Sequence, residues 1–218
     1  MRALKIPDSG AKKKLLDAAE RLVAENGFDL VSVRDITGEV KANVAAVNYH
    51  FGSRETLMDL VVLRLLQPLL EERLKALDGA GKKPSVEKII DSFASPLLSI
   101  AGSLGMDQFF FLRLIGRILV LPPAKISQPL STEWQAMLER YQAALENALP
   151  DMPSARVAAR FAFFDAGLSQ SLLGLEPSDD FAELLQDWIA FASQGFGAVA
   201  APTKQKKDDP QELLLFDF

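Results

Sequence analysis

Apolar residues recur every three or four positions along most of this chain, which is the spacing of one face of an α-helix. The first such stripe lies within residues 11–25 and consists of Leu15, Leu16, Ala19, Leu22 and Val23. Asn26 and Gly27 follow the stripe and suit the left-handed turn that ends many helices. No run of strictly alternating apolar and polar residues indicates a β-strand. The pattern therefore predicts an all-α fold.

Polar residues that favour helix starts divide the N-terminal part into short helices. Ser32 and Asp35 have the spacing of a capping box and predict a second helix. Asn43 can cap a third helix that ends near His50, and Ser53 opens a long fourth helix. Five more helices are expected over residues 85–101, 106–121, 131–149, 153–173 and 179–200, which makes about nine in all.

Composition narrows the class of protein. The chain has 218 residues, 49% of them hydrophobic, and no cysteine. It can therefore bury a sizeable core, and disulfides and thiolate metal ligands are excluded. The start of the sequence lacks the apolar stretch of a secretion signal, and the longest apolar run, at 109–121, is short and contains Arg113 and Arg117. We expect a cytoplasmic protein that does not enter a membrane.

The distribution of charge is compatible with nucleic-acid binding, although the net charge of the chain is −5. Residues 1–54 hold nine Lys and Arg against seven Asp and Glu, whereas the remainder holds fifteen against twenty-two. A locally positive segment can neutralise phosphates while the rest of the molecule stays acidic. The same charges also fit an ordinary solvated surface, so charge permits DNA binding without demonstrating it.

Residues 30–57 combine two short predicted helices with a tight connection, an arrangement that can present the second helix to a major groove. The residues that carry the pattern are Ala18-Ala19, Asn26-Gly27-Phe28, Ser32-Val33-Arg34-Asp35-Ile36, Val47-Asn48-Tyr49-His50-Phe51-Gly52-Ser53-Arg54-Glu55 and Leu57. They resemble the N-terminal domain of the TetR family of one-component regulators, strongly so over about residues 10–60. The resemblance implies a ligand-responsive repressor that binds a palindromic operator as a homodimer, without a cofactor and without enzymatic activity.

The resemblance also implies a division of the chain into segments. Residues 8–54 are expected to form a three-helix helix-turn-helix domain, and residues 55–200 a C-terminal helical bundle for ligand binding and dimerisation. Residues 201–218, where the composition turns to Lys, Asp and Pro, are expected to be a flexible tail.

Carried onto this chain, the resemblance makes residues 43–50 the recognition helix. Val44, Ala45 and Asn48 are the candidates for contact with base edges. An asparagine amide can pair with adenine, whereas the two apolar side chains can only meet a thymine methyl group or fill space. Contacts to the DNA backbone are expected from Ser32, Arg34, Asn43, Tyr49, His50 and Arg54.

Plainer interpretations of these residues stay open. Tyr49 can lie partly in the core, His50 can be structural, and Asn48 can be simply solvated. One departure from the family pattern concerns the turn before the recognition helix, where Val40-Lys41-Ala42 replaces Ala-Gly-Val. If the backbone there has a positive φ, Lys41 adopts it at a cost of about 1 kcal/mol.

The larger segment offers candidates for a dimer interface and a ligand pocket. The resemblance implies dimerisation through the last two long helices, whose apolar and small residues favour an interface made of Ala159, Phe163, Ala166, Gly167, Gln170, Leu184, Trp188 and Phe191. Bulky and cationic residues predict a pocket lined by Met106, Phe109, Phe110, Arg113, Arg117 and Met137. The alternatives are that these helices form only intrachain core and that the arginines pair with neighbouring Asp or Glu.

Two further interpretations concern function. The segment 45–53, together with Leu-Leu-Gln-Pro-Leu-Leu at 65–70, resembles a TetR subset that senses fatty acids or acyl-CoA, which implies a small apolar or acyl-type effector. A helical lipid carrier that has lost DNA binding is the competing interpretation, and the altered turn at Lys41 is its best argument. An enzyme is disfavoured, because the sequence offers no metal-ligand cluster, no catalytic triad and no glycine-rich phosphate loop.

Overall fold

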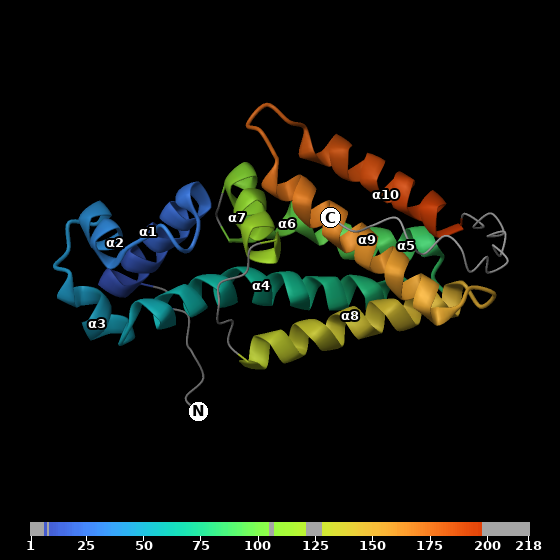
Figure 1. Ribbon diagram of the computed structural model, residues 1–218, viewed down its shortest axis with the longest axis horizontal. Helices are drawn as coiled ribbons and strands as arrows, with labels where there is room; N and C mark the ends of the chain where they lie inside the picture. The colour runs from blue at the N-terminus through green and yellow to red at the C-terminus, as the bar shows by residue number, and fades with distance from the viewer. Residues whose placement is uncertain (1–6, 8, 105–106, 121–127, 198–218) are drawn as a thin grey trace, which may run out of the picture.

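The computed structural model describes residues 7, 9–104, 107–120 and 128–197, which form ten α-helices and no strand (Figure 1). The helices are α1 (Gly10–Asn26), α2 (Val33–Glu39), α3 (Ala45–Phe51), α4 (Arg54–Gly79), α5 (Val86–Ala94), α6 (Pro96–Ser103), α7 (Gln108–Val120), α8 (Gln128–Ala148), α9 (Ser154–Leu173) and α10 (Phe181–Gly197). The predicted all-α fold is confirmed. The predicted tail at 201–218 and Met106 lie outside the described residues.

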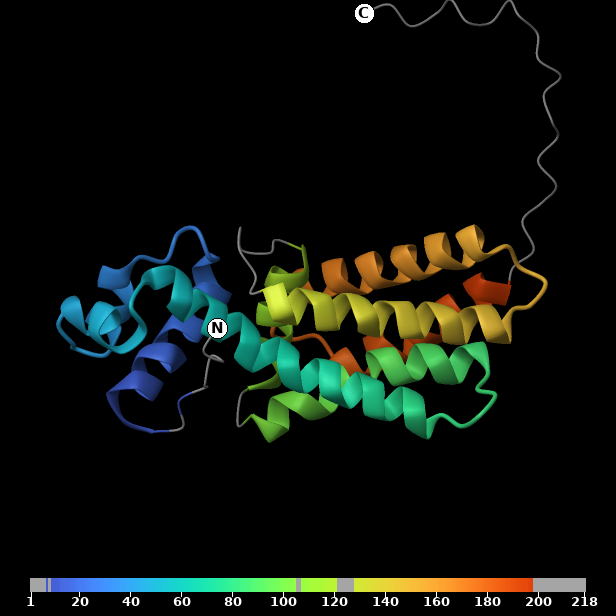
Figure 2. The ribbon, with the colours of Figure 1, turned by 90° about the horizontal axis from the view of Figure 1, so that it is seen from below.

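The molecule is elongated, with a head of α1–α3 at one end and a body of α5–α10 at the other (Figures 1 and 2). Helix α4 runs through both parts: it packs against α1 and α3 in the head and against α5, α6 and α8 in the body. Its 26 residues correspond to about 39 Å of helix. Because α4 is continuous, a single helix joins the head to the body.

The short helices of the head begin where the sequence placed their caps. The Ser32 hydroxyl accepts a hydrogen bond from the Asp35 backbone N–H, and the Asp35 carboxylate accepts one from the Ser32 backbone N–H. This is the expected capping box. The Ser53 hydroxyl likewise accepts a hydrogen bond from the Thr56 backbone N–H at the start of α4. Ile36 and Val47 are fully buried and fix α2 and α3 beneath α1.

The turn between α2 and α3 contains strained backbone at Lys41. Its φ is +53°, and it is the one non-glycine residue with a positive φ in the described part of the chain. The Ala42 backbone N–H donates to the Thr37 carbonyl at 2.8 Å and closes the turn. The expectation of a positive φ is confirmed, and the helix-turn-helix forms although no glycine occupies the position.

The number of helices differs from the expected nine because the helix predicted over 85–101 is two helices. Helix α5 ends at Ala94 and α6 begins at Pro96. Proline has no backbone N–H and crowds the preceding turn, so it suits the first turn of a helix and not its interior. The apolar spacing continues across the break, which is why the pattern alone did not reveal it.

Helices α7 and α9 cross in close contact inside the body. A Cβ atom added at Gly116 would lie 2.6 Å from the backbone nitrogen of Leu173 and 2.9 Å from the Leu172 carbonyl carbon. Such a distance leaves no room for any side chain, so Gly116 is required for this crossing. The side chains of α7 that are buried are Phe111, Leu112, Leu114, Ile115 and Ile118.

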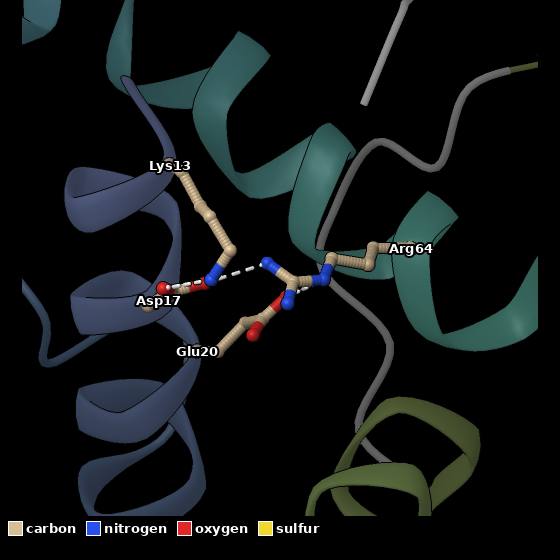
Figure 3. Close-up of polar contacts among 4 residues, drawn as sticks. All are labelled: Lys13, Asp17, Glu20 and Arg64. Atoms are coloured by element: carbon tan, nitrogen blue, oxygen red, sulfur yellow. Dashed lines mark hydrogen bonds and ion pairs between the residues drawn. The ribbon is translucent and has the colours of Figure 1, made fainter. Parts of the chain in front are cut away.

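The junction between head and body contains a cluster of four charged residues. Lys13, Asp17 and Glu20 lie on one face of α1, and Arg64 reaches them from α4 (Figure 3). Arg64 Nη1 lies 2.7 Å from Asp17 Oδ1, and its Nε lies 3.4 Å from Glu20 Oε1. Lys13 Nζ completes the cluster at 2.6 Å from Asp17 Oδ2.

Glu20 is the member of this cluster whose carboxylate is buried at a cost in free energy. Its side chain is buried, and Oε1 has an ion pair with Arg64 but no hydrogen bond. Burial raises the pKa of Glu20 to about 7, since the attraction of Arg64 does not offset the loss of hydration. Burial alone would also raise the pKa of Asp17, but hydrogen bonds from Lys13 and Arg64 hold it below its usual value.

We predict that Glu20→Gln stabilises the protein at alkaline pH. The folded-state pKa of Glu20 is raised, so its favourable contribution is complete at low pH and is lost as the pH rises to about 7. The free energy of unfolding of the variant should match that of the wild type near pH 4.5. It should exceed the wild-type value at pH 8.5 by an amount on the order of 3 kcal/mol. Urea denaturation at several pH values measures the difference.

The matched control is Glu72→Gln, which removes the same charge from an exposed pair with Lys75. This change should alter the free energy of unfolding little at any pH. A Glu20→Gln variant that is less stable than the wild type at pH 8.5 would contradict the prediction, because it would mean that the ionised carboxylate is held favourably.

Candidate nucleic-acid interface and interior sites

The outer side of α3 presents the residues that the sequence nominated for base contact. Asn43, Val44, Ala45 and Asn48 are all exposed. The Asn43 side-chain oxygen accepts a hydrogen bond from the Ala45 backbone N–H at 2.8 Å, so it caps the first turn as predicted. Val44 already has helical backbone angles. The four side chains therefore lie at the start of α3 and on its first turn, which the Asn43 cap holds in place.

Two aromatic residues lie at the C-terminal end of this helix. Tyr49 is 85% exposed, which excludes the alternative that it belongs to the core. His50 is half-buried, and the centroid of its ring lies 5.0 Å from that of Tyr49 in an edge-to-face arrangement. Phe51 is buried and holds this end of α3 against the head. The Tyr49 hydroxyl is thus carried on a fixed helix with its ring free of the core.

The first turn of α2 supplies two further candidates. The Ser32 hydroxyl is already engaged in the capping box, where it also donates to Asp35 Oδ2 at 2.6 Å. These hydrogen bonds from Ser32 lower the pKa of Asp35. Arg34 is exposed. Of the two, Arg34 has the side chain that can reach a phosphate, whereas the main role of Ser32 is to start the helix.

The structure gives Arg54 a role that differs from the predicted phosphate contact. Its Nε donates to the Val31 carbonyl at 2.8 Å, and its Nη2 donates to the Phe28 carbonyl. The guanidinium therefore ties the first turn of α4 to the segment between α1 and α2. Arg54 positions the head on α4, and no sequence pattern indicates this because its two partners are backbone carbonyls more than twenty residues away.

The residues predicted to line a ligand pocket do not come together. Phe109 and Phe110 line a cleft of about 980 Å³ between head and body, whereas Met137 is buried in α8. Arg117 donates to the carbonyls of Ala24 and Glu25 at 2.8 and 3.0 Å, so it caps the last turn of α1. Its partners are neither a ligand nor the Asp and Glu of the alternative interpretation.

Arg113 lies one turn before Arg117 on α7. It is half-buried, with its guanidinium carbon 5.5 Å from the centroid of the Phe109 ring. Its Nε is buried and has no hydrogen-bond partner. The two arginines therefore do not act as the pair that the sequence suggested.

An interior polar cluster that the sequence did not reveal lies in the body. Arg73 of α4 is 0% exposed, and its Nε donates to the Phe93 carbonyl at 2.9 Å. The Tyr141 hydroxyl donates to the Arg73 carbonyl at 2.7 Å and lies 3.3 Å from the Ser92 hydroxyl. Burial raises the pKa of this tyrosine to about 12. Arg73 occupies an inward position of an otherwise apolar stripe on α4. That position in the sequence was the only sign that a polar cluster lies in the body.

Helices α9 and α10 leave a continuous apolar face uncovered. Phe163 is 76% exposed and Phe191 is 70% exposed. Trp188 lies between the two helices, donates from Nε1 to the Ser171 hydroxyl, and packs so closely on Gly167 that a Cβ there would meet it at 2.7 Å. Other exposed residues of the predicted interface are Ala159, Ala166, Gln170 and Leu184. A shallow apolar pocket of about 240 Å³ lies between the two phenylalanines.

The described residues contain neither a metal-binding cluster nor a membrane-spanning helix. No group of His, Asp and Glu side chains there has the arrangement to hold a metal ion. None of the described helices is long and apolar enough to cross a bilayer.

Comparison with known proteins supplies the family. A model of the tetR family of bacterial regulatory proteins matches residues 15–61, and a model of the tetracyclin repressor-like C-terminal domain matches residues 91–195. The nicotine-responsive transcriptional repressor HdnoR of Paenarthrobacter nicotinovorans is 29% identical over 97 residues, which is 44% of this chain but only half of that protein. An uncharacterised regulator of Bacillus subtilis, YfiR, is 24% identical over 73% of this chain and 78% of its own length.

Solved structures show the same fold over most of the chain. The ketosteroid transcriptional regulator KstR2 of Mycobacterium tuberculosis superimposes with a TM-score of 0.65 at 16% identity, covering 87% of this chain and 96% of its own. The two family models together span more than half of the sequence, one over the head and one over the body. The chain therefore belongs to the tetR family of bacterial regulatory proteins and is a DNA-binding transcriptional regulator, not an enzyme.

Proposed function

We propose that the protein represses transcription as a homodimer, with α3 of each copy in the major groove of a palindromic operator. The single observation that carries this proposal is the exposed face of α3, where Asn43, Val44, Ala45 and Asn48 lie on a helix anchored from below by Val47 and Phe51. A major groove about 12 Å wide admits such a helix, and an asparagine amide can read adenine there. Because the operator is DNA, we expect the protein to act in the cytoplasm.

The supporting contacts divide into two kinds. Asn48, Val44 and Ala45 are assigned to base edges, whereas Arg34, Tyr49 and His50 are assigned to the DNA backbone. Backbone contacts fix the register of a protein on DNA and base contacts select the sequence. Arg54 is withdrawn from this set, because its guanidinium is bound to carbonyls within the head.

The second copy is assigned to the face of α9 and α10. An isologous dimer would cover Phe163, Phe191 and Leu184, whose exposure is otherwise costly for an apolar patch of this kind. The two heads would then lie on the same side of the assembly, with half-sites roughly 34 Å apart. The four helices brought together carry small residues at Ala159 and Ala166, which permit close approach.

The effector is proposed to be a small apolar compound of the acyl type that enters the body. Support comes from the aromatic interior around Phe93, Tyr141 and Phe161, whose ring centroids lie 5.0 to 6.2 Å apart. A ligand regulates DNA binding only if it binds one head spacing more tightly than another. Helix α4 connects this interior to the head and is the element whose position the effector would change.

The DNA assignments predict two different phenotypes. Arg34→Gln should weaken binding to every operator sequence by about tenfold and reduce the slope of log K against log salt by about 0.9, as expected for one lost phosphate contact. Asn48→Ala should instead remove discrimination at an adenine position, a change of about 1–3 kcal/mol. Binding selection from random DNA, followed by fluorescence anisotropy on the selected operator, measures both.

A matched control is Lys75→Gln, which removes a cation from the exposed side of α4 within the body. It should leave operator affinity and its salt dependence unchanged. If Arg34→Gln and Asn48→Ala both bind the operator like the wild type, α3 does not enter the groove as proposed. Absence of any DNA binding by the wild type at low salt would favour the carrier interpretation.

The dimer assignment predicts that Phe163→Glu separates the two copies. A buried, unpaired carboxylate at the centre of an apolar interface is strongly unfavourable, whereas the exposed side chain of the isolated chain tolerates the change. Sedimentation velocity should show a monomer with unchanged helix content by circular dichroism. Leu30→Glu, at a residue of the head that is 77% exposed, is the control and should remain dimeric. A dimeric Phe163→Glu variant would rule out this face.

A further inference from the structure

Arg73 is a buried cation without an adequate partner. Its Nε is bound to the Phe93 carbonyl, but its Nη1 has no hydrogen-bond partner. The acid that influences its pKa is Asp165 of α9, and no ion pair joins the two among the described residues. Burial lowers the pKa of Arg73 to about 10, so the side chain still carries its charge at neutral pH.

Such an arrangement is costly for the fold. A buried charge is tolerated when hydrogen bonds and a counter-charge replace its hydration. Here Nη1 has no hydrogen bond, and Asp165 interacts with the guanidinium without forming an ion pair among the described residues. Other inward positions of α4 are filled by apolar side chains, such as those of Leu69, Leu70 and Leu77. The retention of a guanidinium at Arg73 is therefore explained better by recognition than by stability.

The walls around this charge are aromatic. The guanidinium carbon lies 3.6 Å from the centroid of the Phe93 ring and 5.3 Å from that of Trp134. Phe161 and Phe164 of α9 pack edge-to-face on Phe93, with centroids 5.3 and 5.8 Å away. Together these four aromatic rings form an apolar environment around the Arg73 guanidinium.

The backbone beneath Arg73 is fixed by a separate set of hydrogen bonds. The Tyr141 hydroxyl joins the carbonyls of Arg73 and Ser92, at 2.7 and 3.0 Å, and so ties α8 to α4 and α5. This hydroxyl also lies 3.3 Å from the Ser92 hydroxyl, so its partners all lie within the fold and it holds the backbone of Arg73 in place.

We propose that Arg73 Nη1 binds the carboxylate of the effector, in a site formed by α4, α5, α8 and α9. This inference rests on the proposed ligand-responsive function and specifies the chemical class of its ligand: an apolar compound that ends in a carboxylate. Burial raises the pKa of Asp165, whereas the attraction of Arg73 lowers it.

The site is connected to the head through helix α4. Arg73 lies on α4, as does Arg64, which holds α1 through Asp17 and Glu20. The aromatic rings pack closely on the guanidinium, so a ligand that reaches it must displace rings between α4, α8 and α9. That displacement changes the position of α4, and with it the position of the head.

The test uses the full-length protein and a panel of apolar acids, each compared with its uncharged primary amide: octanoate, dodecanoate and benzoate. Binding is measured by isothermal titration calorimetry and thermal shift for the wild type, Arg73→Met and Arg73→Lys. At least one acid should bind the wild type more tightly than its amide. Arg73→Met should weaken that acid by at least about tenfold and abolish the preference, and Arg73→Lys should retain part of it.

Thermal stability separates recognition from a structural role. Arg73→Met removes a buried charge without an adequate partner, so its melting temperature should equal or exceed that of the wild type. Arg140→Met is the control, since it removes an arginine from the surface of α8 and should leave both acid binding and stability unchanged.

Three outcomes would overturn the proposal: no acid binds the wild type, acids and amides bind equally, or Arg73→Met keeps the preference for acids. A variant that loses stability while its acid binding is unchanged assigns Arg73 to the fold alone. Operator binding measured in parallel keeps the two proposals separate. A wild type that binds its operator but none of the acids refutes the ligand site and leaves the regulatory function in place.

Discussion

The attachment of α1 to the body is the constraint on which the rest of the structure depends. Arg64 of α4 binds the middle of α1 through Asp17 and Glu20, and Arg117 of α7 binds its last turn through two backbone carbonyls. Arg54 adds a third attachment, from the start of α4 to the segment after α1. These three guanidinium groups set the orientation of α3, because α2 packs on α1 and α3 packs on α2 and α4.

The same attachment explains how an event in the body can reach the DNA-binding surface. Helix α4 runs through head and body, helix α7 belongs to the body, and each holds α1 by an arginine. A change in the angle between them is therefore transmitted to α1 as a rotation or a shift, without any contact between effector and head. Two buried ionisable residues lie here, Arg73 on α4 and Glu20 in contact with it through Arg64, and the burial of such groups costs free energy.

The head could be predicted from the sequence almost residue by residue because its signals are local. Ser32, Asp35 and Asn43 fix the helix starts through hydrogen bonds to residues two or three positions away. The positive φ at Lys41 was expected from the family pattern, which has glycine at this position. In the body, the break at Pro96 was missed, and the predicted pocket residues dispersed to a cleft, the core and a helix cap.

The sequence by itself determined the helical periodicity, the caps of the head and the exposed side of α3, since each follows from the spacing of neighbouring residues. Only the tertiary structure decided the partners of the arginines. Arg54 binds carbonyls 23 and 26 residues away, and Arg117 binds carbonyls 92 and 93 residues away. Backbone carbonyls are present at every position, so no sequence pattern distinguishes an arginine that will bind them from one that remains free for DNA or for a ligand.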